Sequence, residues 1–374
     1  MADRILFLTL KVFSANGGIE KVCKVAGKAM YELGLQSGGP VKIFSMYDDP
    51  GYVGINKYFP QLLFTGFGKH KAQFVLKSLQ QGSKCRIVIL SHINLLLAGY
   101  LIKKLSPSTK LVLLAHGIEV WTPFPFWKKR MLHKLDIILP VSHFTKEKMK
   151  SLYGLPEERF VVMNNCLDPF LEMPLEGTKD SVLKDRYGLK DDHKVLLTVT
   201  RMAGTEQYKG YDKVLPALPE LMLKYPGIRY LLVGKYDDME KQRLDKLINT
   251  LGLKGIVLFA GYIADEELAA HFKLADIFVM PSENEGFGIV FIEAMFYGVP
   301  VIAGNKDGSA DALCNGELGL MVNPGNITEI IAAISKVLDN RKAYLPDYDK
   351  LMRHFGYTVY KEKFRKVFER LVES

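Results

Sequence analysis

Short apolar runs alternate with amphipathic stretches along the first half of the chain. The first run, Ile5–Leu10, is followed by a turn at Asn16-Gly17-Gly18 and then by apolar residues at i, i+3, i+4 and i+7 spacing, which predicts a helix packed on a sheet. The other runs are short and apolar or β-branched, as expected for strands buried on both faces of a parallel sheet. These predicted strands are Val41–Ser45, Ile87–Leu90, Lys110–Ala115, Ile137–Val141 and Phe160–Met163.

A second series of strand-like runs begins after a polar, poorly patterned stretch at residues 172–192. Helical segments such as Lys213–Tyr225 and Asp265–Leu274 separate its runs. Two successive series of alternating strands and helices predict an α/β protein with two doubly wound, Rossmann-like domains. The strands of the second series are predicted at Val195–Thr200, Tyr230–Val233, Ile256–Phe259, Ile277–Met280 and Val299–Ala303.

The polar stretch divides the chain into two predicted domains. We expect an N-terminal domain over residues 1–170, a hinge over 171–190 and a C-terminal domain over 191–355, with a charged, amphipathic helix at about 356–374 that packs back on the first domain. Open α/β sheets bind ligands at the carboxyl ends of their strands. A site is therefore expected in the loops that follow the strands, in a cleft between two facing domains.

The composition is that of a protein with two well-packed cores. A chain of 374 residues is too long for one ordinary domain, and 48% of the residues are hydrophobic against 24% charged. The four cysteines lie far apart without a Cys-x-x-Cys pair, which disfavours a zinc ribbon or a disulfide framework and indicates a reducing compartment. Ile5–Leu10 has the length of a strand, not of a signal-peptide core. The uncharged stretch Ile87–Ile102 is interrupted by polar residues and predicts a strand and a helix, not a membrane span.

The net charge of +9 is unevenly distributed. Residues 1–187 carry 26 Lys and Arg against 15 Asp and Glu, whereas residues 188–374 carry 24 against 26. The excess in the first half indicates an anionic partner, and ordinary solvation of lysine side chains is the alternative. We expect no nucleic-acid partner, because no known nucleic-acid-binding module accompanies the charge.

Two cations follow the first strand of the second series. Arg201 comes directly after Val195–Thr200, and Lys209-Gly210 lies a few residues further on. Arginine forms a paired fork to phosphate oxygens and lysine supplies a point charge, so the two suit a diphosphate. Most surface Arg and Lys residues are simply solvated, so these two cations alone are weak evidence for a diphosphate site.

A glycine-containing loop follows the strand at Ile277–Met280. Gly286 and Gly288 allow the backbone to approach a ligand closely, and the helix behind them directs free N–H groups and its positive dipole end toward it. Glu293 lies eight residues after Glu285, so the two carboxylates could contact different parts of one extended ligand, such as a hexose and a ribose. A salt-bridged helix residue is the alternative for Glu293.

These residues resemble a known family. Pro281-Ser282-x-x-Glu285-Gly286-Phe287-Gly288, followed by Glu293-Ala294 at Glu-x7-Glu spacing, is similar to the signature of glycosyltransferase family 4, whose members have the GT-B fold. The resemblance extends in order along nearly the whole chain. Its other matches are Gly17-Gly18-Ile19-Glu20, Asn165-x-x-Asp168, Arg201 with Lys209-Gly210, Phe259-x-Gly261-Tyr262 and Asp265-Glu266-Glu267-Leu268.

The resemblance implies catalytic roles for three residues of the second domain. Arg201 and Lys209 would bind the leaving diphosphate and offset the charge that grows on it as the glycosidic bond breaks, and such preorganised charge is usually the largest catalytic contribution. Glu285 would hold the sugar hydroxyls. Further donor contacts are implied for the backbone amides of Gly286, Phe287, Gly288 and Ile289, for Glu293 at the ribose and for Tyr262 in the segment that holds the base.

The first domain contributes a histidine and a glycine turn. His116 follows the apolar run Leu111–Ala115 and matches the family's active-site histidine, which contacts the donor sugar. A capping or structural role is the alternative for His116, and it is the preferred interpretation of His92 near another strand end. Gly17 and Gly18 would complete the phosphate site as the cleft closes.

The resemblance implies a retaining, same-face mechanism in which the departing phosphate helps to deprotonate the acceptor. No Asp-x-Asp pair follows a predicted strand, which agrees with catalysis by Arg and Lys in place of a divalent cation. We therefore expect no metal and no cofactor, with a nucleotide diphosphate sugar as the substrate. Thr200, Cys166 and the pair Lys235-Tyr236 depart from the usual family pattern, which weakens any inference about the base and the sugar.

Aromatic and basic residues gather in the window at residues 121–135. Such a mixture suits a lipid headgroup layer, which predicts a lipid-linked acceptor and a peripheral position on the inner, cytoplasmic face of a membrane. A buried aromatic helix under the sheet, with solvated basic residues, is the alternative. The surface is predicted from Trp121, Phe124, Phe126, Trp127, Lys128, Lys129 and Arg130.

The sequence as a whole predicts a metal-independent hexosyltransferase that uses a UDP- or GDP-linked sugar. Its acceptor would be a glycan or a lipid-linked molecule of polysaccharide, lipopolysaccharide or glycolipid biosynthesis. Another GT-B activity (an inverting transferase, a sugar phosphorylase or a nucleotide-sugar epimerase) is the first alternative. The second is a non-catalytic module that binds nucleotide sugars.

Overall fold

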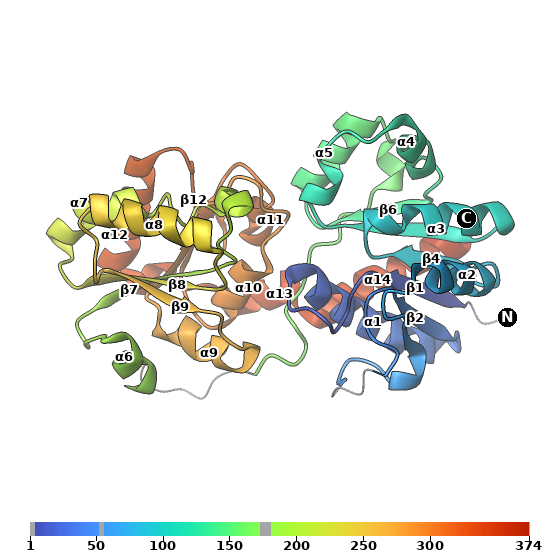
Figure 1. The fold of residues 1–374 in the computed structure, drawn as a ribbon, viewed down its shortest axis with the longest axis horizontal. Helices are drawn as coiled ribbons and strands as arrows, with labels where there is room; N and C mark the ends of the chain where they lie inside the picture. Colours follow the sequence, from blue (N-terminus) through green and yellow to red (C-terminus); the bar gives the residue numbers. More distant parts are fainter. Residues whose placement is uncertain (1–3, 52–55, 173–180, 374) are drawn as a thin grey trace. The chain divides into compact units, whose positions relative to one another are not determined.

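The computed structural model describes residues 4–51, 56–172 and 181–373. The chain forms two compact units, and the C-terminal residues return to the first of them: one unit comprises residues 1–169 and 355–374, and the other comprises residues 170–354. Each unit is built on one six-stranded parallel sheet with helices along it (Figure 1). The predicted fold class of two doubly wound α/β domains is confirmed.

The sheet of the first unit has the strand order β3-β2-β1-β4-β5-β6, and every neighbouring pair is parallel. The strands β1 to β3 follow one another toward one edge of the sheet, and β4 to β6 then follow toward the other edge, starting beside β1, as in a doubly wound fold. The strands are β1 (Ile5–Thr9), β2 (Val41–Ser45), β3 (Phe64–Gly66), β4 (Ile87–Leu90), β5 (Lys110–Ala115) and β6 (Ile137–Pro140). The helices are α1 (Gly18–Ser37), α2 (Lys71–Gly82), α3 (Leu96–Leu105), α4 (Phe126–Leu132), α5 (His143–Tyr153) and α14 (Tyr357–Glu373).

Two details of this sheet differ from the prediction. The short strand β3 was not expected, and the predicted strand at Phe160–Met163 makes only an isolated bridge with β6. Val161 and Met163 donate backbone hydrogen bonds of 3.0 and 2.8 Å to β6. The ladder stops there because Pro140 has no N–H to donate back to the segment.

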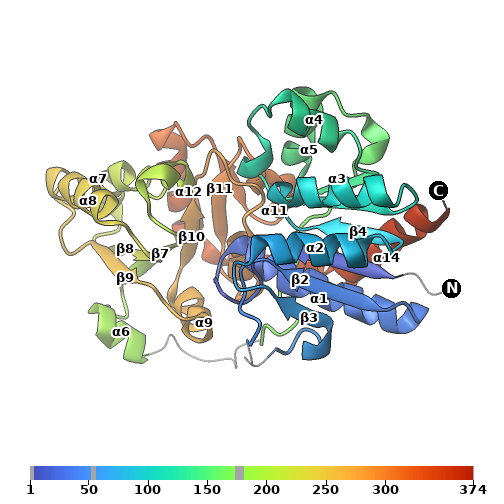
Figure 2. The ribbon, with the colours of Figure 1, turned by 45° about the vertical axis from the view of Figure 1, so that its right-hand side comes forward.

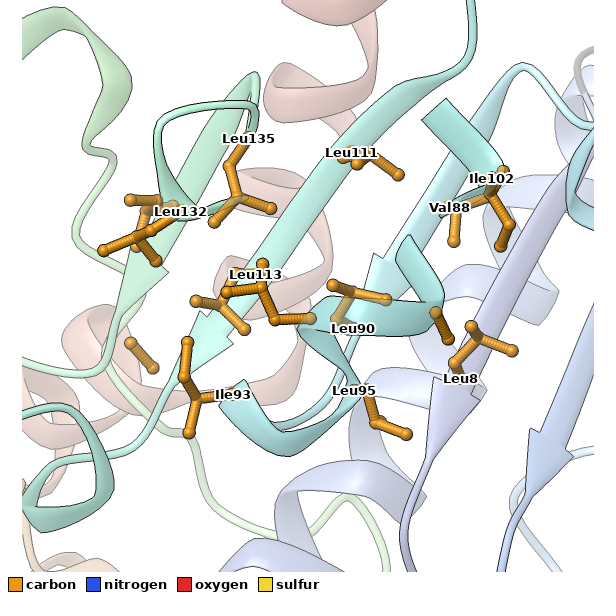
Figure 3. Packing of buried hydrophobic residues seen from close by; sticks show 14 of the residues in the cluster. Leu8, Val88, Leu90, Ile93, Leu95, Ile102, Leu111, Leu113, Leu132 and Leu135 are labelled. Carbon is orange, nitrogen blue, oxygen red and sulfur yellow. The ribbon is translucent and has the colours of Figure 1, made fainter. Parts of the chain in front are cut away.

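Buried aliphatic side chains fill the space between the first sheet and its helices. β1 and β4 are buried along their whole length, as the apolar runs predict for inner strands of a parallel sheet. Helices α2 and α3 pack side by side, and residues of both belong to the core cluster (Figure 2). Figure 3 shows leucine and isoleucine side chains of the sheet, of α3 and of the segment after α4 meeting in this layer.

The sheet of the second unit has the order β12-β11-β10-β7-β8-β9 and is also parallel throughout. Its strands are β7 (Lys194–Val199), β8 (Ile228–Val233), β9 (Val257–Gly261), β10 (Ile277–Met280), β11 (Val301–Gly304) and β12 (Leu320–Val322). Its helices are α6 (Ser181–Tyr187), α7 (Leu218–Lys224), α8 (Asp238–Thr250), α9 (Asp265–Leu274), α10 (Ile289–Phe296), α11 (Ser309–Ala312), α12 (Ile327–Asp339) and α13 (Tyr348–Phe355).

The predicted helix at Lys213–Tyr225 is shorter in the structure. A 3-10 turn at Leu215–Ala217 precedes α7, and each of the two elements has a proline in its first turn. Proline cannot donate the hydrogen bonds of a helix interior, so Pro216 and Pro219 are tolerated only at these two helix starts. The chain therefore enters α7 later than the apolar pattern alone suggests.

The predicted hinge at 171–190 is partly helical. Residues 173–180 lie outside the described part of the chain, and α6 follows them. This helix contacts α9, where Arg186 lies 2.9 Å from the carboxylate of Glu267 and the Tyr187 hydroxyl lies 2.9 Å from the buried ring of His271. Residues 181–187 thus belong to the packed second unit and are not a free linker.

Helix α14 belongs to the first unit through its contact with α1. The Lys361 ammonium lies 2.8 Å from the carboxylate of Glu32 on α1, and the side chain of Phe364 is fully buried. The salt bridge is only partly buried and is screened by water, so apolar burial is the main stabilising contribution of this helix.

Replacing Phe364 with alanine is expected to destabilise the first unit by about 3–5 kcal/mol, because it deletes a fully buried ring. The measurement is urea unfolding followed by tryptophan fluorescence, since both tryptophans, Trp121 and Trp127, belong to this unit. Phe272→Ala, an equally buried ring of α9, is the control and should leave that transition in place. An unchanged tryptophan transition in F364A would contradict the role of α14 in this core.

Candidate functional site

The carboxyl end of the second sheet carries a lysine–carboxylate pair. Lys209 lies in the loop after β7 and Glu285 in the loop after β10, and the two side chains form an ion pair. Both are largely buried, with 18% and 15% of their side-chain surfaces exposed. Burial alone would lower the pKa of Lys209, but Glu285, with Tyr208 and Glu206, outweighs it and the pKa is raised, so the lysine stays charged.

Arg201 also leaves β7 at this end of the sheet. Its guanidinium pairs with the carboxylate of Glu206, and 69% of the Arg201 side chain is exposed against 14% of Glu206. The two predicted clamp cations therefore both have a carboxylate partner. Screening by water makes the exposed Arg201 pair the weaker of the two.

Close backbone packing brings the loops after β7 and β10 together. Gly210 has φ 74°, and a Cβ atom there would lie 2.0 Å from the Pro281 carbonyl oxygen. Glu283 N–H donates a 2.8 Å hydrogen bond to the Tyr208 carbonyl. Only glycine combines this left-handed conformation with this close approach, so Gly210 fixes Lys209 beside Glu285.

A buried carboxylate is hydrogen-bonded to residues on both sides of Lys209 in its loop. Glu240 of α8 is 1% exposed, and it accepts hydrogen bonds from the Tyr211 hydroxyl at 2.8 Å, from Gln207 at 3.0 Å and from Arg243 at 2.6 Å. Burial would raise the pKa of Glu240, but Arg243, Tyr211 and Gln207 lower it overall. Sequence reasoning missed Glu240 because two of its partners, Tyr211 and Gln207, lie 29 and 33 residues away along the chain.

The glycine-containing loop leads directly into α10, where the sequence predicts a helix. Gly288 occupies the left-handed region, with φ 83°, at the start of the helix. Phe287 is 1% exposed and packs in the core, so only its backbone can contact a ligand. Glu293, the predicted ribose contact, lies within α10 and is 5% exposed, while Ile289 is the first residue of the helix.

A second unpredicted carboxylate holds this loop. Asp307, which follows β11, is 2% exposed and accepts a 2.7 Å hydrogen bond from the Glu285 N–H. Gly308 N–H in turn donates a 2.8 Å hydrogen bond to the Glu285 carbonyl. The only sequence signal for Asp307 is its position just after a strand, close to a glycine.

Exposed aromatic residues lie after β8 and β9. Tyr262 is 52% exposed, and the Lys235 ammonium lies 4.8 Å from the centre of its ring. Tyr236 is 41% exposed and packs edge-on against Phe259, with ring centres 5.9 Å apart. Five neighbouring strands thus end in polar or aromatic groups at the same edge of the sheet, which is where an open α/β sheet binds a ligand.

In the first unit, His116 follows β5 and is held on two sides. Its Nε2 lies 2.7 Å from the Ser91 carbonyl oxygen, and its backbone N–H donates a 2.6 Å hydrogen bond to the Glu119 carboxylate. His92 caps a 3-10 turn by accepting a 3.1 Å hydrogen bond from Asn94 N–H, as its structural interpretation predicts. Burial lowers the pKa of His92; Glu119 acts in the opposite direction.

Gly17 and Gly18 form the turn that begins α1, after the loop from β1. Asp48, which is 1% exposed, binds this loop by accepting hydrogen bonds from the N–H groups of Val12 at 2.7 Å and Ser14 at 2.6 Å. Asp48 thus has the same relation to its loop as Asp307 has in the second unit. Sequence reasoning missed this residue as well.

The aromatic and basic window divides into a packed part and an exposed part. Trp121 packs edge-on against Phe144, and Phe124 stacks on Tyr153 at 4.9 Å, but both precede α4 and do not form the buried helix of the alternative. Phe126 is instead 80% and Trp127 58% exposed at the start of α4.

The basic residues of the window also lie on α4. Lys128 lies 4.1 Å from the ring centre of Phe124, and burial lowers its pKa. Lys129 and Arg130 stand in the last turn of the helix. Across the described ranges, no helix has the length and apolar character that a membrane span requires.

Comparison with known families assigns both halves of the chain. Residues 18–169 match Glycosyltransferase Family 4, and residues 180–361 match Glycosyl transferases group 1. The chain belongs to the family 4 type of glycosyltransferases. The resemblance predicted from the Glu-x7-Glu segment and its companion motifs is thereby confirmed.

Named relatives of this family 4 chain include mannosyltransferases. The GDP-mannose-dependent alpha-(1-6)-phosphatidylinositol monomannoside mannosyltransferase of Mycolicibacterium smegmatis is 30% identical over 246 residues, which are 63% of this chain and 62% of the relative. The protein of the same name from Mycobacterium tuberculosis is 30% identical over 249 residues, covering 64% and 63%. The matched part thus spans less than two thirds of these relatives' length.

A solved structure shares the fold over nearly the full length of the family 4 chain. HepE of Anabaena, determined in complex with UDP, superposes with a TM-score of 0.77 at 20% identity and covers 98% of this chain and 100% of its own. The similarity supports the GT-B assignment of the fold.

Gly308→Ala is expected to destabilise the family 4 protein by about 1–3 kcal/mol, because a Cβ atom would lie 2.0 Å from the Gly286 carbonyl oxygen. Urea unfolding monitored by circular dichroism measures the effect. Gly204→Ala is the matched control: no atom lies within 4 Å of its Cβ, and its cost should stay within about 0.5 kcal/mol. Equal stability of the two variants would show that the loops do not pack as described.

Proposed function

We propose that this protein is a retaining, metal-independent hexosyltransferase that moves a sugar from a GDP- or UDP-linked donor to a glycan or lipid-linked acceptor. The observation that carries the proposal is the convergence of Arg201, Lys209 and Glu285 at one edge of the second sheet, beside the Gly286–Gly288 backbone. Two cations suit a diphosphate, and a carboxylate suits sugar hydroxyls. The names of the mannosyltransferase relatives support a nucleotide sugar as donor and a glycolipid as acceptor.

In the proposed reaction the glycosidic bond between sugar and diphosphate breaks, and Arg201 and Lys209 stabilise the negative charge that moves onto the phosphate. Glu285 accepts hydrogen bonds from sugar hydroxyls, and Glu293 binds the ribose. We propose Tyr262 as a contact to the base because its ring is exposed after β9. His116 and the Gly17–Gly18 turn are the proposed donor contacts of the first unit.

The two cations offer the charge stabilisation that a divalent metal gives other enzymes, so we expect turnover to survive EDTA. The donor is found first, by a thermal-shift screen with UDP, GDP, ADP and their sugars, because a ligand that binds only the folded state raises its stability. The anomeric configuration of the product, measured by NMR, tests retention; an inverted product would reassign the chain to one of the alternative GT-B activities.

Lys209→Ala is expected to lower turnover on the order of 10²-fold, because it removes a cation from the developing phosphate charge. Release of the nucleotide diphosphate from the donor measures the rate. Lys213→Ala provides the control: Lys213 lies four residues away and pairs with Glu283 at 2.6 Å, and its loss should leave turnover close to that of the unmodified protein. Equal activity of K209A and the unmodified protein would refute the proposed clamp.

We further propose that the protein associates peripherally with the inner face of a membrane through α4. Phe126 and Trp127 are exposed next to Lys129 and Arg130, and exposed aromatic residues beside cations suit an anionic headgroup layer. A lipid-linked acceptor would be reached at this surface.

Co-sedimentation with vesicles containing anionic lipid should retain the protein at low salt and release it at high salt, because salt screens the attraction of the basic residues. Phe126→Ser combined with Trp127→Ser should abolish binding. Leu223→Ser removes an equally exposed apolar residue (86%) from the second unit and should leave binding unchanged. Absence of binding at low salt by the unmodified protein would exclude the membrane role.

A further inference from the structure

Asp307 joins two loops of the second unit through one buried carboxylate. One of its oxygens accepts from the Ser282 hydroxyl at 2.8 Å and from the Glu285 N–H at 2.7 Å, and the other accepts from the Ser309 N–H at 2.9 Å. The hydroxyls of Ser282 and Ser309 lie 3.0 Å apart, and both residues are fully buried. The carboxylate therefore ties the loop after β10 to the start of α11.

Amides and hydroxyls stabilise the charge of Asp307. Burial raises the pKa of its carboxyl group, while the N–H groups of Glu285 and Ser309 and the hydroxyls of both serines act in the opposite direction. A buried carboxylate is costly unless its lone pairs are bonded. Because this one accepts hydrogen bonds from three separate residues, it holds those residues in a fixed arrangement.

The peptide groups on both sides of Glu285 are fixed by the same short segment. Its N–H donates to Asp307, and its carbonyl accepts from the Gly308 N–H at 2.8 Å. Gly308 also packs so closely against the Gly286 carbonyl that no side chain fits between them. The direction in which the Glu285 side chain leaves the backbone is thus set by residues 307 and 308.

We propose that Asp307 is a positioning residue that orients Glu285 toward the transferred sugar. This inference rests on the proposed function, which assigns the sugar hydroxyls to Glu285. Asp307 itself is buried behind the loop and acts through the Glu285 peptide, because its oxygens are occupied by Ser282, Glu285 and Ser309.

The arrangement requires a carboxylate. An asparagine at position 307 would keep one acceptor oxygen but turn its NH₂ group toward either the Glu285 N–H or the Ser309 N–H. Two donors would then face each other, and one buried N–H would lose its partner. Asp307→Asn therefore disturbs the loop with almost no change in side-chain volume.

The kinetic experiment compares D307N with the unmodified full-length protein. Turnover should fall on the order of 10²-fold, because a small displacement of a substrate-holding group is costly. Binding of the nucleoside diphosphate product, which the proposal assigns to Arg201 and Lys209, should be unchanged. Asp276→Asn is the matched control: Asp276 is also buried and accepts a 2.8 Å hydrogen bond from the Val195 N–H, at the opposite, amino-terminal end of the strands. D276N should retain turnover.

A double-mutant cycle separates positioning from general loss of stability. If Asp307 acts through Glu285, D307N combined with E285Q should be no slower than E285Q alone. Additive losses in the double variant would overturn the inference. Should D307N fail to fold, Ser282→Ala removes one donor and keeps the carboxylate, and the same cycle with E285Q applies.

Hydrogen exchange of the Glu285 amide tests the inference independently of activity. Exchange at the Glu285 amide, or at the Ser309 amide if the NH₂ group turns that way, should accelerate in D307N and not in D276N, because one of these two N–H groups loses its acceptor only in D307N. Unchanged exchange at both amides in D307N would overturn the positioning role even if turnover falls. If the unmodified protein has no transferase activity with any donor, the proposed function fails, and accelerated exchange would still support Asp307 as the residue that fixes Glu285.

Discussion

Burial of both faces of each parallel sheet is the constraint on which the structure depends. The inner strands are mostly apolar, and buried polar side chains among them, such as Thr9 and Thr198, donate hydrogen bonds to backbone carbonyl groups of neighbouring strands. Chemistry is therefore confined to the strand ends, and the second sheet places Arg201, Lys235, Tyr262, Glu285 and Asp307 after successive strands at its carboxyl edge. The topology of the sheet therefore sets the position of the site, and the individual motifs supply its side chains.

Loops at such an edge leave the hydrogen-bonded ladder, and their backbone groups need other partners. The protein meets this need with buried carboxylates. Asp48 binds the loop before α1, and Asp307 binds the loop before α10. Glu240 bonds instead to side chains around the Lys209 loop. Asp307 and Glu240 thus bond to the loops of the candidate site in the second unit, and Asp48 bonds to the glycine-turn loop of the first.

The sequence predicted the fold well, because apolar runs of strand length are a local signal. The errors have local causes too: β3 is three residues long, Pro140 stops the ladder beside Phe160, and α6 occupies part of the expected linker. Glu285 and Lys209 were found because they stand in recognisable motifs. Asp307, Asp48 and Glu240 were not found, because most partners of these buried carboxylates come close only in the folded chain.

The ion pairs at Arg201 and Lys209 give the proposed donor site a further property. Both cations already hold a carboxylate, Glu206 and Glu285 respectively. A diphosphate that binds there would therefore replace a carboxylate as the partner of each cation. In that exchange Glu285 would be displaced from Lys209 by the phosphate and become available to the sugar attached to it, so occupation of one half of the site would prepare the other half.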